Sequence, residues 1–242
     1  MPKTLFISDL HLAENHPATT DTFLRFARTL DSQVEALYVL GDLFDYWVGD
    51  DDLQEPFHQT IVRAFTDVTN RGIDLFFMHG NRDFLLGEVF SAACGGSLLN
   101  DPTSIDLYGT PTLLMHGDTL CTDDVEYMRF RAMVRDPMWQ KDFLAKPLVE
   151  RRAIGAELRR QSEQAKQLKS SEITDASAST IEAVLRAHDY PYIIHGHTHR
   201  PMHHIYTLDS KTCERWVLTD WHDNRGGYLE VTPMGWTAHT LP

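Results

Sequence analysis

Short apolar runs bounded by glycine or aspartate recur along the chain, and this pattern predicts buried strands. The runs lie at 5–7, 36–40, 75–78, 112–115 and 192–194. Helical spacing of apolar residues falls at 20–30, 53–70, 84–93 and 178–188, and further strands are expected at 216–219, 228–232 and 236–240. Because strands alternate with helices, the pattern predicts an α/β fold with helices outside the sheet.

The stretch from 126 to 169 interrupts this alternation and differs in charge. It carries eleven basic and six acidic residues, a net charge of +5 in a chain whose formal net charge is −13. Pro137 and Pro147 should divide it into separate helices. We expect a single domain, 1–242, with a helical insertion or lid at 123–170. The alternative is a bundle packed on the core with a solvated basic face.

Net charge, cysteine content and the absence of long apolar runs limit the possible partners and the cellular compartment. A net charge of −13 disfavours nucleic acid as a partner, because an acidic surface repels a phosphate backbone. Cys94, Cys121 and Cys213 fit no zinc motif and favour a reducing compartment. The N-terminus lacks a signal-peptide pattern, and no apolar run approaches the roughly 20 residues of a spanning helix. We expect a protein that is soluble or attached to a membrane only at its surface.

Five motifs rich in histidine and carboxylate follow five of the predicted strands. They are Asp9-Leu10-His11, Gly41-Asp42-Leu43-Phe44-Asp45, Gly80-Asn81-Arg82-Asp83, His116-Gly117-Asp118 and His195-Gly196-His197-Thr198-His199. Ligands of open α/β sheets bind beyond the carboxyl ends of the strands, so loops that are distant in sequence can converge there. We therefore expect one site built from all five motifs.

The residue types in these motifs suit a pair of divalent metal ions. Asp9 and His11 are two positions apart, as are His195 and His197, so an extended strand would point each pair to one face. A carboxylate such as Asp42 can bridge two cations. Mixed imidazole and carboxylate ligands suit manganese, iron or zinc.

Each motif taken alone has a simpler explanation. Gly-Asp before a loop is common turn chemistry, and a single histidine such as His116 is more often a core residue than a ligand. Asn81 offers a neutral amide oxygen, which limits negative charge where a phosphate must bind. The order and strand-end placement of all five motifs favour the metal site. Spacing alone leaves His199 as a competitor of His195.

The ordered set Asp-x-His, Gly-Asp-x-x-Asp, Gly-Asn-x-Asp, His and Gly-His-x-His resembles the calcineurin-like metallophosphoesterase superfamily. Within it, the chain most resembles the family of diphosphatases that hydrolyse UDP-2,3-diacylglucosamine in lipid A synthesis. The matching segments are SDLHL at 8–12, GDLFDYWVGDDD at 41–52, HGNRDFLLG at 79–87, HGDTLCTDDVEY at 116–127 and IHGHTHRP at 194–201. The basic helical stretch lies where that family carries an insertion.

The resemblance implies an αββα sandwich of two mixed sheets with a helical insertion, and two manganese ions (Mn2+) per chain. Carried over by position, the ligands of one ion are Asp9, His11, Asp42 and His197, and those of the other are Asp42, Asn81, His116 and His195. These seven residues and Arg82 form the catalytic set. The substrate contacts carried over are Asn81, Arg82, Asp124, Ser162, Lys166, Lys169 and His195. Lys166 stands where close relatives are expected to have asparagine.

The implied reaction is hydrolysis of a pyrophosphate bond. A metal-activated hydroxide would attack the α-phosphorus of the UDP-linked diacylated glucosamine and release UMP and 2,3-diacylglucosamine 1-phosphate. Arg82 suits this substrate because it stays charged and donates no proton, while a sugar phosphate leaves without protonation. The alternative for Arg82 is a structural salt bridge to Asp83 or Asp45.

A lipid substrate would give the insertion a role. Its apolar side would receive the acyl chains, and its basic side would face anionic headgroups or the diphosphate. The resemblance thus implies peripheral attachment to the cytoplasmic face of the inner membrane, with Trp139 and Phe143 as candidate contacts. No obligate protein partner is evident.

Two other functions are considered. One is a generic dinuclear-metal phosphodiesterase that acts on a nucleotide or another phosphoester. The other is a non-enzymatic scaffold that has kept the fold and lost the metal site. This alternative is disfavoured because no expected metal-ligand residue is missing from the sequence. The sequence assigns no role to Asp45, Asp118 or His199, which are candidates for orienting the ligands.

Overall fold

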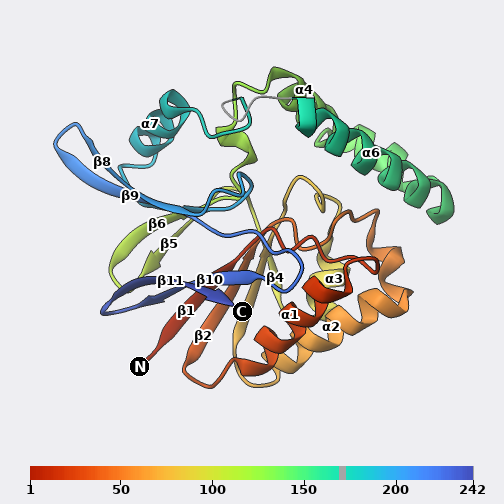
Figure 1. The fold of residues 1–242 in the computed structure, drawn as a ribbon, viewed down its shortest axis with the longest axis horizontal. Helices are drawn as coiled ribbons and strands as arrows, with labels where there is room; N and C mark the ends of the chain where they lie inside the picture. The colour runs from red at the N-terminus through yellow and green to blue at the C-terminus, as the bar shows by residue number, and fades with distance from the viewer. Residues whose placement is uncertain (169–172, 242) are drawn as a thin grey trace.

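The computed structural model describes residues 1–168 and 173–241. Two β-sheets pack face to face, and helices lie outside both of them (Figure 1). The first sheet has the strand order β11-β10-β1-β2-β3-β4, and the second has the order β5-β6-β7-β9-β8. The expected αββα sandwich of two mixed sheets is confirmed.

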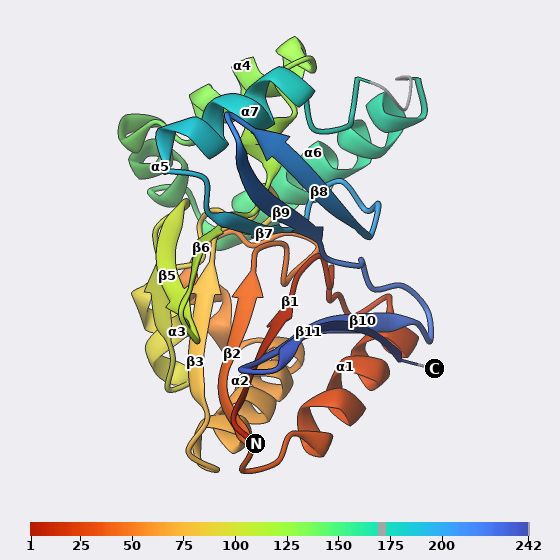
Figure 2. The same cartoon turned by 90° about the vertical axis from the view of Figure 1, so that its left-hand side faces the viewer.

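The first sheet is parallel at its centre. Its strands are β1 Lys3–Ile7, β2 Val34–Leu40, β3 Asp74–Met78, β4 Ser97–Leu99, β10 Gly226–Thr232 and β11 Gly235–Leu241. The strands β1 to β4 run parallel, whereas β10 and β11 are antiparallel additions. Their arrows in Figure 2 show that β1, β2 and β3 end toward the side where the insertion helices lie.

The second sheet repeats this design. Its strands are β5 Thr103–Leu107, β6 Thr110–Leu114, β7 Tyr192–His195, β8 Met202–Leu208 and β9 Lys211–Val217. Its three central strands β6, β7 and β9 are parallel, and β5 and β8 close the edges as antiparallel partners. The carboxyl ends of both sheets therefore meet at one edge of the molecule.

Side-chain alternation along the central strands explains the layers, because successive residues of a strand point to opposite faces. Leu5 and Ile7 pack into the large core beneath α1 Pro17–Thr29 and α2 Pro56–Thr69. Phe6, between them, belongs to the core that joins the two sheets. The second sheet buries its outer face against α7 Ala178–Ala187 through a third cluster.

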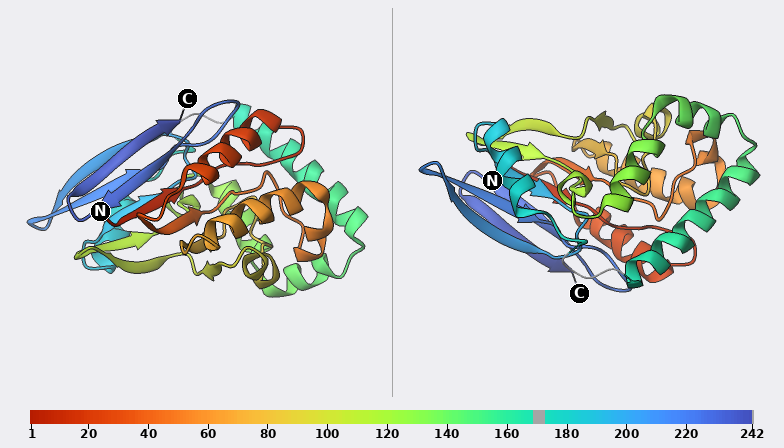
Figure 3. Two further views of the ribbon diagram at one scale, coloured as in Figure 1. Left: turned by 90° about the horizontal axis from the view of Figure 1, so that it is seen from below. Right: turned by 90° about the horizontal axis from the view of Figure 1, so that it is seen from above.

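The insertion is helical. Its helices are α4 Val125–Val134, α5 Pro137–Leu144 and α6 Leu148–Leu168. Pro137 is the first residue of α5, and Pro147 directly precedes α6, so both prolines stand at helix starts as expected. Seen from above, these green helices lie over the loop-bearing end of the sheets (Figure 3).

Several element boundaries differ from the sequence expectations. The helix expected at 84–93 is only α3 Glu88–Ala93, and the helix expected at 53–70 is a short turn, η1 Asp50–Gln54, followed by α2. A second short turn, η2, spans Asp118–Leu120. The strand expected at 216–219 is β9, which begins earlier. Pattern analysis missed β4, β5 and β8, because the first is very short and the other two are edge strands with exposed residues at alternate positions.

Candidate metal centre

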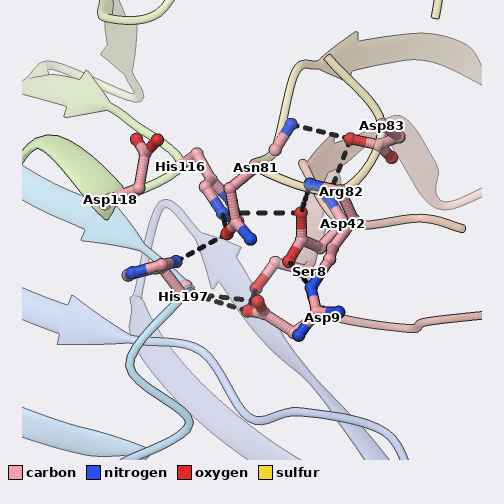
Figure 4. Close-up of polar contacts among 12 residues, drawn as sticks. Ser8, Asp9, Asp42, Asn81, Arg82, Asp83, His116, Asp118 and His197 are labelled. Carbon is pink, nitrogen blue, oxygen red and sulfur yellow. Dashed lines mark hydrogen bonds and ion pairs between the residues drawn. The ribbon is translucent and has the colours of Figure 1, made fainter. Parts of the chain in front are cut away.

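The loops that follow β1, β2, β3, β6 and β7 converge at the shared carboxyl edge of the two sheets (Figure 4). Asp9, His11, Asp42, His197 and His199 all have left-handed backbone conformations, with φ between 47° and 66°. Such conformations are uncommon for residues other than glycine and concentrate at functional sites. The expectation that extended strands would pair Asp9 with His11 and His195 with His197 is therefore wrong: His195 is the last residue of β7, and the other three residues lie beyond the strand ends in tight loops.

The first group of potential ligands contains Asp9, His11 and His199. Their ligand atoms all lie within 4.8 Å of one another. The Nε2 atoms of His11 and His199 are 3.2 Å apart, and His199 Nε2 lies 3.5 Å from Asp9 Oδ1. Asp42 Oδ2 is 3.9 Å from His11 Nε2, which brings a fourth donor to this group.

The second group surrounds the side-chain oxygen of Asn81. His116 Nε2 lies 3.0 Å from Asn81 Oδ1, and His197 Nδ1 lies 2.8 Å from the same atom. Asp42 Oδ1 is 3.7 Å from His116 Nε2, so Asp42 stands between the two groups. Six expected ligands thus come together, and Asp42 has the position of a bridging carboxylate.

The placement of the histidines after β7 departs from the expected ligand set. His199 lies beside Asp9 and His11, where His197 was expected, and His197 lies beside Asn81, where His195 was expected. His195 is fully buried; its Nε2 faces Arg215 Nη1 at 3.0 Å, and its Nδ1 lies 2.8 Å from the carbonyl of Gly196. Both nitrogens of His195 therefore already have partners away from the two groups.

The sequence contained a signal for this arrangement. The family pattern Gly-His-x-His begins at Gly196, so its two histidines are His197 and His199. His195 is the last residue of β7, whereas the two others follow it in the loop. A histidine inside the strand is held by the neighbouring β9, which carries Arg215.

A second layer of contacts orients these side chains. Ser8 Oγ donates to Asp9 Oδ2 at 2.5 Å, and the backbone N–H of His197 donates to both oxygens of Asp9. His116 Nδ1 lies 2.9 Å from the carbonyl oxygen of Leu40, which leaves Nε2 to face the site. His199 Nδ1 is 3.4 Å from Asp220. Such outer partners set ring orientation and the tautomer of a ligating histidine.

Two glycines allow the loops to approach this closely. A Cβ at Gly196 would lie 2.1 Å from Asp9 Oδ2, and a Cβ at Gly80 would lie 2.1 Å from Asp42 Oδ1. Real side chains cannot adopt such distances, so both positions require the absence of a side chain.

Burial and neighbouring charges shift the pKa values of the ligand residues far from their usual values. Burial raises the pKa of Asp42 to about 7. Burial alone would lower the pKa of His116, but the carboxylates of Asp42, Asp9 and Asp118 raise it to about 9. Burial, followed by the charge of His116, lowers the pKa of His197 to about 3. A cation placed among these groups would stabilise the ionised carboxylates and the neutral imidazoles together.

Arg82 does not form the structural salt bridge considered as its alternative. Asp83 accepts hydrogen bonds from the backbone N–H groups of Gly80 and Leu43, and the guanidinium of Arg82 is 4.0 Å from Asp42 Oδ2. The Nε and Nη1 atoms of Arg82 are buried without a hydrogen-bond partner among the described residues. Unsatisfied donors at a cavity wall are costly unless a ligand completes them.

A cavity of about 590 Å³ opens from the two ligand groups toward the insertion. Of the expected substrate contacts, Asn81, Arg82, Asp124 and Ser162 line it. Asp124 also caps α4 by accepting the backbone N–H of Tyr127 at 3.0 Å. Lys166 lies within α6, although its side chain is outside the described atoms, and Lys169 lies outside the described residues.

Much of the cavity wall is aromatic. Its aromatic lining comes from both the core and the insertion: Tyr46, Trp47, Phe84, Tyr127, Phe130, Trp139 and Phe143. Trp139 and Phe143 stack with ring centroids 5.0 Å apart, and Phe143 is buried. Both side chains thus belong to the cavity wall, so their proposed role as membrane contacts is not supported.

Five basic residues of the insertion contact the core, whereas Arg129, Lys141, Lys146 and Arg160 are exposed. Arg131 pairs with Asp118, Arg151 with Asp51, and Arg152 with Asp52 and Glu55. Arg159 pairs with Asp45, and Arg135 donates to the carbonyl oxygen of Gly80. The positive insertion is therefore complementary to an acidic face of the core, a partner that composition alone could not identify.

The structure brings three further residues to the site that received no assigned role from the sequence. Asp118 is fully buried and accepts from Tyr127 Oη at 2.6 Å and from Arg131 Nε at 2.7 Å. The Tyr127 ring lies against the His197 ring, with centroids 5.8 Å apart. Asp45 reaches across to Arg159. All three residues lie within matched segments, and only that place in the sequence could have marked them.

None of the helices in the described part of the chain has the length and apolarity needed to cross a bilayer. This finding concerns the helices alone.

Comparison with known proteins gives a consistent result. A UDP-2,3-diacylglucosamine hydrolase of Aromatoleum aromaticum is 52% identical over 220 residues, which cover 91% of this chain and 89% of the relative. Proteins of the same name from Chromobacterium violaceum and Cellvibrio japonicus are 50% and 44% identical, over 95% and 96% of this chain and of themselves. The family model described as calcineurin-like phosphoesterase matches residues 2–201. The resemblance read from the five motifs is thereby confirmed, and this chain belongs to the calcineurin-like phosphoesterase family.

Proposed function

We propose that the protein hydrolyses the pyrophosphate bond of UDP-2,3-diacylglucosamine and releases UMP and 2,3-diacylglucosamine 1-phosphate. The observation that carries this proposal is the cavity, which joins two groups of metal-ligand residues to an aromatic chamber between core and insertion. A phosphoester hydrolase with an apolar chamber suits a substrate with both a diphosphate and acyl chains. The names of the relatives described above agree with this substrate.

The donor set supports a two-metal site. We assign Asp9, His11, Asp42 and His199 to one ion and Asp42, Asn81, His116 and His197 to the other, because these side chains lie together. Mixed imidazole, carboxylate and amide donors fit manganese, which we propose as the native metal. When bound, the two ions would supply a nucleophile at neutral pH and clamp the phosphoryl oxygens.

The protein's own groups position and stabilise the substrate. Asn81 and Arg82 stand where the attacked phosphoryl group would bind, and the unpartnered donors of Arg82 would neutralise charge on its oxygens. Asp124 and Ser162 belong to the insertion and line the same cavity, and their side chains suit the hydroxyl and amide groups of the sugar. We propose further contacts from Lys166 and Lys169.

We propose that residues 123–170 act as a lid within a single domain of residues 1–242. The lid contributes Phe130, Trp139 and Phe143 to the chamber, and these aromatic side chains would hold the acyl chains. Closing the site over the diphosphate would also exclude water from the reaction.

The test is UMP release from UDP-2,3-diacylglucosamine by metal-stripped protein, with and without added Mn2+. We expect release only with the metal. Release restored by zinc or iron and not by manganese would contradict the choice of metal. A folded, metal-loaded protein that releases no UMP and yet cleaves a nitrophenyl phosphodiester would instead support the generic phosphodiesterase.

We also propose peripheral attachment to the cytoplasmic face of the inner membrane. Met138, Leu144 and Val149 on α5 and α6 are 63%, 43% and 77% exposed, and the exposed Lys141 and Lys146 flank them. An apolar patch with basic neighbours suits an anionic lipid surface.

Flotation with phosphatidylglycerol vesicles tests the attachment. The triple variant Met138→Glu/Leu144→Glu/Val149→Glu should stay at the bottom of the gradient. Met234→Glu, at an 80% exposed position on the turn between β10 and β11, is the matched control and should float like the unmodified protein. If the unmodified protein, the triple variant and Met234→Glu all float equally, these three side chains do not form the membrane contact.

A further inference from the structure

Arg159 combines two properties among the described arginines of α6. It lines the cavity, and its Nη1 is buried without a hydrogen-bond partner among the described residues. Its neighbours Arg151, Arg152 and Arg160 do not line the cavity. An unsatisfied guanidinium nitrogen beside a ligand cavity indicates an acceptor that is supplied by the ligand.

The orientation of Arg159 is set by two carboxylates. Its Nε donates to Asp45 Oδ1 at 2.6 Å, and its Nη2 is 2.7 Å from Glu163 Oε1. Asp45 lies three residues after Asp42, in the loop that supplies the bridging carboxylate. The metal-site loop of the core therefore positions a cation of the insertion, with one nitrogen left for a ligand.

Arg82 is the counterpart of Arg159 on the core side of the same cavity. Arg82 also has buried donors without a partner among the described residues. Burial lowers the pKa of Arg82, and the positive charge of Arg159 acts in the same direction.

A diphosphate needs two positive regions. The metal-ligand groups and Arg82 account for the phosphate that is attacked. We propose that Arg159 is a specificity-determining residue that donates from Nη1 to the second phosphate, the one that leaves with the sugar, and that Asp45 is its positioning residue. This inference rests on the proposed function and deepens it. Charge that develops on the leaving phosphate would be stabilised by a pre-positioned guanidinium.

The test compares a diphosphate with a single phosphodiester on manganese-loaded, full-length protein. Arg159→Gln should lower kcat/KM for UDP-2,3-diacylglucosamine by about 10- to 100-fold, the range for one hydrogen bond to a charged group. It should change kcat/KM for bis(p-nitrophenyl) phosphate by less than about threefold, because that substrate has no second phosphate. Arg160→Gln is the matched control: its side chain is 57% exposed, pairs with Glu157, and should leave both activities unchanged. Equal losses on both substrates, or no loss on either, would overturn the proposal.

A second readout does not need the lipid. UDP and UMP differ by one phosphate, and both can be tested as inhibitors of bis(p-nitrophenyl) phosphate hydrolysis. We expect UDP to inhibit the unmodified protein more tightly than UMP does, and Arg159→Gln to reduce that preference by about tenfold. A preference that the variant retains would overturn the role of Arg159. If the unmodified protein releases no UMP from the lipid, the proposed function fails, and the inhibitor preference still decides the role of Arg159.

Asp45→Asn and Arg159→Lys separate positioning from charge. Asp45→Asn should reduce the UDP preference less than Arg159→Gln, and the double variant should be no worse than Arg159→Gln alone, because both act through one guanidinium. Arg159→Lys keeps the charge and should retain part of the preference. Two results would overturn the proposal. One is that Arg159→Lys loses as much of the UDP preference as Arg159→Gln does. The other is that the losses of the two single variants add up in the double variant.

Discussion

The Nε2 atoms of His11 and His199 lie 3.2 Å apart, although 188 positions separate the two residues in sequence. Two imidazole nitrogens at that distance face one common point, which suits a single cation. Both residues have left-handed backbone conformations, one in the loop after β1 and the other in the loop after β7.

His199→Ala should therefore remove one of the two metal ions. We expect about one Mn2+ per chain by elemental analysis and a loss of kcat/KM of about 100-fold or more, because the two-metal clamp is broken. A variant that keeps two ions and full activity would contradict the ligand assignment proposed for His199.

His195→Ala should behave differently. It leaves the buried Arg215 Nη1 without its acceptor, so we expect the free energy of unfolding to fall by about 1–3 kcal/mol in chemical denaturation. The metal content should stay at two ions per chain. Loss of an ion without loss of stability would restore His195 as a ligand.

Gly80→Ala should weaken metal binding, because its Cβ would meet Asp42 Oδ1 at 2.1 Å. We expect the dissociation constant for Mn2+, measured by calorimetry, to rise by about 10- to 100-fold, as for other changes that displace a ligand. Gly72→Ala is the control: it has a φ of +84° and open space around its Cβ position. It should cost about 1–2 kcal/mol of stability from backbone strain and leave metal binding unchanged.

The stability of the metal-free protein should fall as the pH rises from 7 to 8.5. The folded-state pKa of His116 is raised from 6.5 to about 9, so its stabilising charge is fully present below pH 6.5 and is lost as the pH rises through 9. A bound metal needs the neutral imidazole, so binding releases that proton and becomes tighter with pH. The increase in melting temperature caused by Mn2+ should thus be larger at pH 8.5 than at pH 7. An equal increase at both values would contradict this linkage.

Asp118→Asn should loosen the insertion. The change weakens the contacts with Tyr127 and Arg131 that hold α4 on the core, and we expect a cost of about 1–3 kcal/mol. Amide hydrogen exchange in α4 should become faster, and KM for the lipid should rise. Asp123→Asn, at an exposed carboxylate near the start of the same helix, should change neither quantity. If both variants behave alike, Asp118 has no special role in docking.

Much of the sandwich could be predicted because its signals are local. The continuous apolar run of Leu5, Phe6 and Ile7 marks a strand buried on both faces. Pro137 and Pro147 mark helix starts in the insertion. Edge strands such as β8 escaped because their exposed positions weaken the apolar pattern, and their place depends on pairing with β9.

The sequence by itself determined the family, the five motifs and the apolar cores, since each depends on residue identity and short-range order. The Gly-His-x-His pattern at 196–199 already favoured His197 and His199 over His195, but only the tertiary structure decided which of these two meets Asp9. The pairing of β7 with β9 holds His195 against Arg215, and the loop that follows brings His199 to His11 and Asp9. The tertiary structure also paired Arg131, Arg151, Arg152 and Arg159 of the insertion with carboxylates of the core. These choices depend on contacts between residues that are up to 188 positions apart, and no local pattern encodes them.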